Sequence, residues 1–208
     1  MKAEDNRILI TGATGFVGQA LCRHLMLQKG QVVPEGRGGQ QSKEALESPS
    51  SRGLDIQLLI REPSDFRKIP PGLGAGYILG SMQDEASLVA ACSGRNQVIH
   101  LAGLAHAGRG SEQQAVDTNI QGTRNLLDAA IDADVSRIVY LSSSLAEAAA
   151  SGEGDVTAYG ESKLQAEELL QGASNEGKMD VVILRAVNVY GPGMKGNIAS
   201  MISMIDRG

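Results

Sequence analysis

A run of three glycines is the first feature of this chain that indicates chemistry. Gly12, Gly15 and Gly18 follow an apolar segment at intervals of three residues. Gly12 permits a sharp turn as the chain leaves a strand, and Gly15 lets backbone N–H groups approach phosphate oxygens. Gly18 lets the following helix lie close to the sheet. The run predicts a pyrophosphate-binding loop between a strand and a helix.

A tyrosine and a lysine form the second such feature: Tyr159 and Lys163 are four residues apart and follow a serine run, residues 142–144. Side chains at this spacing share one face of a helix. A nearby ammonium lowers the pKa of a tyrosine, which can then exchange a proton with a hydroxyl or carbonyl group as hydride moves. A serine hydroxyl at a strand end can hydrogen-bond the same substrate oxygen. The alternative for the tyrosine and lysine alone is an exposed helix start.

Short apolar segments alternate with helical patterns along the chain, and they must position these residues. Because the segments are continuously apolar, we expect helices to bury both faces of the strands. The pattern predicts an α/β fold with a doubly wound parallel sheet of the Rossmann type. The expected strands are residues 7–11, 56–60, 77–79, 97–101, 137–141 and 181–184, and the expected helices are residues 15–29, 84–92, 113–131 and 159–171.

Residues 34–55 interrupt the alternation, since they are rich in Gly, Pro and Ser, and they predict an inserted flexible loop. The second strand is then either residues 31–33 or residues 56–60. We favour residues 56–60, because they end at Arg61 and a polar residue that contacts the adenosine ribose normally follows this strand. The alternative is that Arg61 is a solvated strand end.

Composition excludes several classes of protein. The chain has 208 residues, of which 42% are hydrophobic and 21% are charged, and this suits one domain with a large core. A net charge of −5 without a basic run argues against binding to nucleic acid or anionic lipid. A polar N-terminus and the absence of a long apolar run predict no membrane segment and a cytoplasmic protein. Cys22 and Cys92 are expected to be reduced and buried, with no metal site.

Six motifs in order resemble the extended short-chain dehydrogenase/reductase superfamily, specifically the NAD-dependent epimerase/dehydratase family that acts on nucleotide sugars. The resemblance extends over almost the whole chain. The motifs are TGATGFVG at 11–18, VIHLAG at 98–103, NIQGTRNLL at 119–127, SSS at 142–144, YGESK at 159–163 and LRAVNVYGPG at 184–193.

This resemblance implies roles for individual residues. Tyr159 would be the acid/base, Lys163 would hold the nicotinamide ribose and tune Tyr159, and Ser144 would polarise the substrate oxygen. Asn188 would lie near the phosphates of the nucleotide sugar, and Asn119 would brace helix and strand ends. The family also suggests a homodimer. The cofactor-binding residues it implies are Gly12, Thr14, Gly15, Phe16, Val17, Gly18, Arg61, Leu101, Ala102, Gly103, Tyr159 and Lys163.

Two histidines and an apolar stripe have alternative interpretations. His100 lies within an apolar strand, so we expect a hydrogen-bonded structural imidazole rather than a catalytic one. His106 follows Gly103 and either approaches substrate or is a loop histidine. An apolar stripe in an expected helix at residues 197–207 predicts core or subunit packing; its members are Ile198, Met201, Ile202 and Ile205.

The chain also departs from the family pattern. Gly80-Ser81 replaces the usual Gly-Asp pair, which removes a carboxylate expected to contact adenine. Extended members continue beyond the point that corresponds to Gly208 into a substrate-binding domain. We therefore expect residues 1–208 to form the NAD(P)-binding domain, residues 186–208 to begin a substrate-binding region, and the C-terminal substrate domain to be truncated.

The residues after Ser144 narrow the reaction that the resemblance implies. Dehydratases place an Asp-Glu pair directly after this position, whereas Leu145-Ala146 stand here and Glu147 is out of step. We expect a nucleotide-sugar epimerase or 4-keto reductase that transfers hydride at the sugar C4. Residues 104–106 and 189–197 look most like bacterial surface-polysaccharide enzymes acting on UDP-N-acetyl-hexosamines, which suggests a UDP-linked substrate.

The sequence leaves two alternatives open for the cofactor and two for the activity. Arg61 can pair with a 2′-phosphate, which favours NADP, whereas Glu62 beside it can accept a bond from a ribose hydroxyl, as NAD requires. Of these two cofactors, we slightly favour NADP. The alternative to an enzyme is a non-catalytic NAD(P)-binding protein or a truncated, inactive fragment of such an enzyme.

Overall fold

The computed structural model describes residues 6–28, 54–61, 63–70, 73, 75–104, 112–154, 156–194, 200–201 and 204–205. These residues form a six-stranded parallel sheet of order β3-β2-β1-β4-β5-β6. Strand order reverses between β1 and β4, and open α/β sheets bind ligands at such a point. The strands are β1 (Arg7–Thr11), β2 (Asp55–Ile60), β3 (Gly76–Leu79), β4 (Gln97–His100), β5 (Arg137–Ser143) and β6 (Asp180–Ala186).

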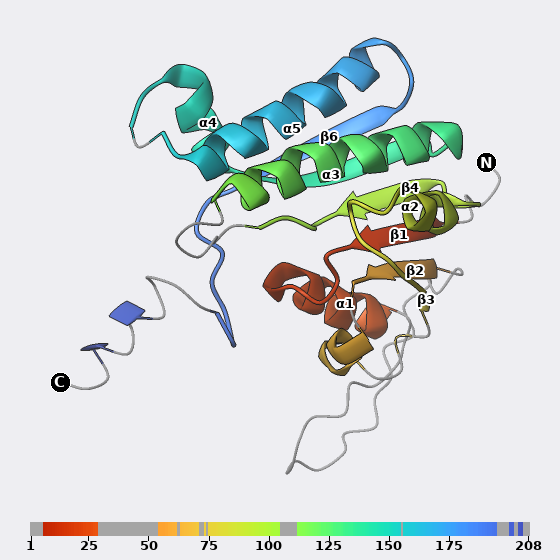
Figure 1. Ribbon diagram of the computed structural model, residues 1–208. Helices are drawn as coiled ribbons and strands as arrows, with labels where there is room; N and C mark the ends of the chain where they lie inside the picture. Colours follow the sequence, from red (N-terminus) through yellow and green to blue (C-terminus); the bar gives the residue numbers. More distant parts are fainter. Residues whose placement is uncertain are drawn as a thin grey trace.

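Helices cover both faces of this sheet. Alternate side chains of a strand point to opposite faces, and Ile8 and Ile10 of β1 pack with α1 while Leu9 packs with α2, α3 and α5. Helices α3 and α5 lie side by side, and α4 lies at one end of α5 (Figure 1). The elements are α1 (Phe16–Gln28), the 3₁₀ helix η1 (Pro63–Lys68), α2 (Glu85–Cys92), α3 (Glu112–Asp132), α4 (Ser144–Ser151) and α5 (Ala158–Asn175).

The doubly wound parallel sheet predicted from the sequence is confirmed. The favoured second strand is also confirmed, because β2 spans Asp55–Ile60. Its alternative, residues 31–33, lies outside the described residues, as do residues 34–53 of the expected inserted loop. The prediction was wrong at the far end of that loop, since Asp55 pairs with Arg7 in the ladder between β1 and β2.

Helix α4 was not predicted, and it corrects the expected strand end at residues 142–144. Strand β5 ends at Ser143, whose side chain accepts a hydrogen bond from the backbone N–H of Leu145 at 3.2 Å and so caps the helix. Ser144 is therefore the first residue of α4. The alanines of this segment favour helix, and Gly152 ends it with the positive φ of 70° that glycine adopts easily.

Candidate active site

The glycine loop joins β1 to α1, and its geometry requires two of its glycines. Gly12 has a φ of +74°, and a Cβ there would lie 2.5 Å from the backbone nitrogen of Ala102. A Cβ on Gly18 would lie 2.2 Å from the carbonyl oxygen of Gly12. Gly15 is exposed and has more room. The loop thus approaches both the end of β4 and its own helix too closely for side chains.

A cavity of about 330 Å³ opens at the carboxyl ends of β1, β2 and β4. Seven of the residues predicted to bind cofactor line it: Gly12, Thr14, Gly15, Arg61, Leu101, Ala102 and Gly103. Phe16, Val17 and Gly18 begin α1 instead and are absent from this lining. Lys68, at the end of η1, lines the cavity with Arg61 and was missed, because nothing in the sequence indicates that η1 folds back to β2.

Helix α5 presents Tyr159 and Lys163 near its start. Thr157 caps the helix by accepting a hydrogen bond from the backbone N–H of Gly160 at 3.0 Å. Lys163 is buried, and its Nζ donates to the carbonyl oxygen of Leu141 at 2.6 Å. The same Nζ lies 4.0 Å from the ring centre of Tyr140. Burial lowers the pKa of Lys163 to about 7, against the opposing charge of Glu167.

The electrostatics of Tyr159 differ from the sequence-based expectation. Lys163 was expected to lower the pKa of Tyr159, whereas burial of this half-buried side chain raises that pKa. The physical reason lies in Lys163, since its ammonium is directed to Leu141 and is itself costly to keep charged in this environment. In this structure Tyr159 therefore holds its proton at neutral pH.

His100 has a hydrogen-bond partner on each ring nitrogen, as expected for a structural imidazole. Thr123 Oγ1 donates to the carbonyl oxygen of Asn119 at 2.6 Å, so it can accept from Nε2 of His100 at 3.1 Å. Nδ1 then accepts from the Thr11 hydroxyl at 2.7 Å. Burial, with a smaller contribution from Lys163, lowers the pKa of His100 to about 3 and keeps the ring neutral.

Asn119 braces the segment after β4 against α5, which is the role expected for it. Its Oδ1 accepts from the backbone N–H of Leu104 at 2.9 Å, and its Nδ2 donates to the carbonyl oxygen of Leu104 at 3.2 Å and to Ser162 Oγ at 3.0 Å. An added Cβ on Gly103 would lie 3.2 Å from Asn119 Oδ1 and 3.8 Å from Lys163 Nζ. Asn119 thus brings the edge of the cavity next to Lys163.

Ser144 lies between contacts that join β5 and α4 to α5. Leu141 before it accepts the bond from Lys163. Leu145 after it has a carbonyl oxygen only 2.5 Å from where a Cβ on Gly160 would lie. Because Gly160 directly follows Tyr159, these contacts bring Ser144 to the same end of α5 as Tyr159 and Lys163.

Asn188 follows β6 and is exposed, in a segment that passes near the glycine loop. A Cβ on Gly191 of this segment would lie 3.7 Å from the ring of Phe16. His106 lies outside the described residues, as do Ile198 and Ile202 of the apolar stripe. The described members of that stripe, Met201 and Ile205, are exposed, so the predicted core packing is not seen for them.

Both cysteines are buried, as expected. Burial raises the pKa of the Cys22 thiol to about 11 and that of Cys92 to about 12.

Within the described ranges no group of three or more metal-ligating side chains comes together. Among the helices of those same ranges, none has the length and apolar character needed to cross a membrane.

The parallel sheet, the glycine loop and the cavity at the reversal of strand order define a dinucleotide-binding α/β domain. Comparison with known families identifies it further: the NAD dependent epimerase/dehydratase family matches residues 8–208, and the chain belongs to this family. The family resemblance recognised in the sequence is thereby confirmed.

Individual relatives are similar over most of this chain. The UDP-glucose 4-epimerase of Vibrio cholerae is 30% identical over 219 residues, covering 97% of this chain and 57% of the relative. The Bordetella bronchiseptica enzyme WbmG, solved with NAD and UDP, has a TM-score of 0.71 and 26% identity, covering 97% of this chain and 59% of that one. A short-chain dehydrogenase/reductase superfamily protein from Agrobacterium tumefaciens with bound NAD has a TM-score of 0.61 and 26% identity. The match covers 86% of this chain and 48% of that one. The chain therefore spans about half of the length of such relatives.

Proposed function

We propose that this chain is the catalytic part of an NAD(P)-dependent nucleotide-sugar epimerase or 4-keto reductase, in which hydride moves at the sugar C4 and Tyr159 exchanges the proton. The observation that carries the proposal is the position of Lys163. It lies between Leu141 at the end of β5 and Gly103 at the edge of the cavity, with Tyr159 one turn earlier on the same helix. The nicotinamide, when bound, would supply the hydride acceptor or donor.

The electrostatics of the described residues support this proton transfer in the direction of carbonyl reduction. Because burial raises the pKa of Tyr159, its hydroxyl is protonated at neutral pH and can donate to a substrate carbonyl oxygen. Ser144, the first residue of α4, would hydrogen-bond the same oxygen and fix its position. Lys163 would hold the nicotinamide ribose, and its pKa of about 7 leaves it partly charged at neutral pH.

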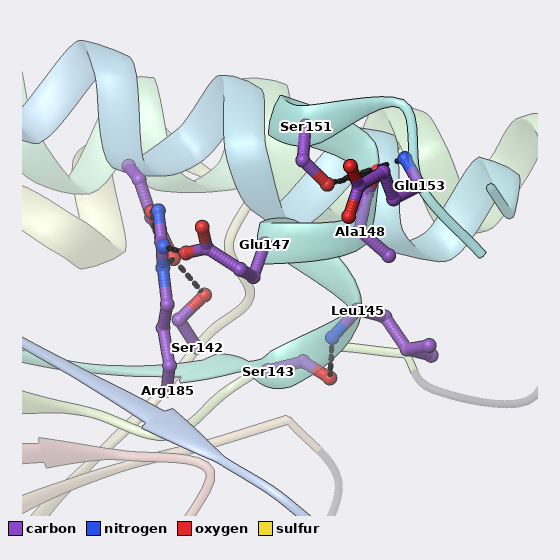
Figure 2. A network of polar contacts seen from close by, with 9 residues as sticks. Ser142, Ser143, Leu145, Glu147, Ala148, Ser151, Glu153 and Arg185 are labelled. Atoms are coloured by element: carbon purple, nitrogen blue, oxygen red, sulfur yellow. Dashed lines mark hydrogen bonds and ion pairs between the residues drawn. The ribbon is translucent and has the colours of Figure 1, made fainter. Parts of the chain in front are cut away.

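The surroundings of Ser144 support an epimerase or a keto reductase over a dehydratase. Leu145 and Ala146 follow Ser144, and Ala146 is fully buried. The next acidic residue, Glu147, forms an ion pair with Arg185 and points toward it (Figure 2). An acidic pair for removing water is therefore missing at the position where dehydratases of the family carry it.

Two cations support NADP as the cofactor, although NAD is the cofactor present in several structural neighbours. Arg61 and Lys68 both line the cavity at the end of β2, where the adenosine ribose of a dinucleotide lies. Ser81, also in the lining, provides no carboxylate to repel an additional phosphate. Glu62, which would favour NAD, lies outside the described residues.

The substrate and assembly proposed from the sequence remain proposals: a UDP-linked sugar, an N-acetyl-hexosamine among the candidates, a homodimer and a cytoplasmic location. UDP is bound in WbmG, and the Vibrio cholerae relative is a UDP-glucose 4-epimerase, which supports the UDP moiety. The rival proposal is a non-catalytic NAD(P)-binding protein or an inactive fragment. The chain spans 57% and 59% of the length of these two relatives, so the activity of the whole protein is part of the proposal.

The two proposals are separated by a turnover screen. The 208-residue chain is incubated with NADH, NADPH, NAD or NADP and with UDP-glucose, UDP-galactose or UDP-N-acetylglucosamine, or with their 4-keto derivatives. Products are followed by chromatography, and cofactor binding by the fluorescence of NADH and NADPH. The enzyme proposal predicts both binding and turnover. Binding without turnover in any combination supports the non-catalytic alternative, and absence of both contradicts each proposal.

A further inference from the structure

Arg185 of β6 connects two acidic side chains from two different helices. Its Nε lies 3.1 Å from both carboxylate oxygens of Glu167, and its Nη2 donates to Oε2 of Glu167 at 2.6 Å. Its Nη1 forms an ion pair with Glu147 of α4 (Figure 2). Glu167 on α5 is 1% exposed and Glu147 is 65% exposed as side chains, so one guanidinium joins a buried carboxylate to a surface carboxylate.

The buried half of this bridge also holds the end of β5. Ser142 is buried, and its hydroxyl donates a hydrogen bond to Glu167. Glu167 lies one turn after Lys163 on α5. Burial raises the pKa of the Glu167 carboxyl, and Ser142 and Lys163 oppose that rise. The Glu167 carboxylate is thus in contact with the strand that precedes Ser144 and lies on the helix that carries Lys163.

Helix α4 depends on outside contacts for its position. It has eight residues, and an isolated helix of this length is unstable in water. Only Ala146 among its residues is buried. Its start is in contact with α5 where Leu145 approaches Gly160, and Glu147 holds its next turn to Arg185. Because Ser144 is the first residue of α4, any movement of this helix moves Ser144.

We propose that Arg185 and Glu147 are positioning residues, which hold α4 against α5 and so set the place of Ser144 relative to Tyr159 and Lys163. An ion pair as exposed as that of Glu147 usually contributes little. Here the guanidinium is already fixed by three contacts to a buried carboxylate, so Arg185 loses little further side-chain entropy when it binds Glu147. The role in catalysis rests on the proposed function, whereas the role in holding α4 does not.

The test compares Glu147→Gln with the 208-residue wild-type chain. Glu153→Gln is the matched control, because Glu153 is an exposed glutamate just after α4. Arg185→Lys is a second variant, since an ammonium keeps the charge but cannot hold two carboxylates in a fork. Amide hydrogen exchange is measured over residues 144–151 and over α1. Rates are measured with whichever of UDP-glucose and UDP-N-acetylglucosamine the wild type converts.

The proposal predicts that amide hydrogens of α4 exchange about fivefold faster in Glu147→Gln and in Arg185→Lys, while exchange in α1 is unchanged. This factor corresponds to the upper end of the free energy that a partly exposed ion pair contributes. It also predicts a kcat about tenfold lower or more, because a small displacement of a reacting group is costly. KM for the sugar and Kd for NADH should stay the same. Unchanged exchange in α4 overturns the proposal. If α4 exchanges faster but kcat equals that of Glu153→Gln, the positioning role is overturned. If the wild type shows no turnover, the proposed function is contradicted, and the exchange rates alone decide whether the bridge holds α4.

Discussion

Lys163 donates a hydrogen bond from Nζ to the carbonyl oxygen of Leu141 at 2.6 Å. This bond connects the second turn of α5 to the end of β5, two residues before the serine cap of α4. A Cβ on Gly103 would lie 3.8 Å from the same nitrogen. The ammonium therefore lies where the cavity edge, the end of β5 and the start of α5 meet.

The pH dependence of stability should report on Lys163. Its pKa is lowered from 10.5 to about 7 in the folded chain, so between these values the unfolded state binds more protons. The contribution of Lys163 to the free energy of unfolding should therefore rise as pH increases from about 7 to 10.5. Urea unfolding of the wild type and Lys163→Met across this range measures it. The difference between the two curves should change with pH, and a constant difference would contradict the placement of a buried, titrating Lys163.

Asn119→Ala should destabilise the domain by about 2 kcal/mol, because it leaves the backbone groups of Leu104 without their buried partner. Gln121→Ala is the control. Gln121 is an exposed amide on the same helix, bonded only to Asn125 one turn later at 2.7 Å, and it should cost less than about 0.5 kcal/mol. Urea unfolding compares the two variants. Equal effects would mean that Asn119 does not brace the segment after β4.

Gly18→Ala should destabilise the domain and weaken NADH binding, because the added methyl group would lie 2.2 Å from the carbonyl oxygen of Gly12. The control is Gly172→Ala. Gly172 lies within α5, and a Cβ there would meet nothing within 4 Å. This variant should raise the free energy of unfolding by about 0.5–1 kcal/mol. Denaturation and fluorescence titration measure both effects, and tight NADH binding by Gly18→Ala would argue against the glycine loop as the phosphate site.

Arg61→Ala should weaken NADPH binding by about tenfold and change NADH binding little, because a charge-assisted bond to the 2′-phosphate is lost. Arg67→Ala is the control, since Arg67 is an exposed arginine on η1 next to Lys68 and does not line the cavity. Fluorescence titration with both cofactors gives the ratio of dissociation constants. The same loss for NADH and NADPH would contradict the proposed NADP preference.

The sequence predicted what is local. Apolar runs predicted six strands to within a few residues. Burial on both faces explains this signal in β1 and β2, whereas the edge strands β3 and β6 are apolar but partly exposed. The glycine loop was predictable from the spacing of Gly12, Gly15 and Gly18, although the backbone that crowds Gly12 belongs to Ala102 at the end of β4. The structural, hydrogen-bonded role of His100 was predictable from its apolar neighbours.

What the sequence did not predict depends on contacts between distant segments. Glu147 and Glu167 are brought together by Arg185, which follows them by 38 and 18 residues, and no local pattern indicates this pairing. Helix α4 was missed although its serine cap, its alanines and Gly152 are local helix signals, because an isolated helix of eight residues is unstable and its position depends on contacts with α5 and Arg185. The raised pKa of Tyr159 was missed because it depends on how the fold buries this side chain.

The central claim, that Tyr159 exchanges a proton during hydride transfer, is tested most directly by Tyr159→Phe. Tyr77→Phe is the control, because Tyr77 is a half-exposed tyrosine on β3 whose ring contacts Phe66. The measurement is the rate of hydride transfer with the sugar that the wild type converts, beside the Kd for NADH. Loss of the proton donor should lower the rate for Tyr159→Phe at least about 100-fold, with a much smaller change in the Kd for NADH, and Tyr77→Phe should behave as the wild type. A Tyr159→Phe rate equal to that of Tyr77→Phe would contradict this claim.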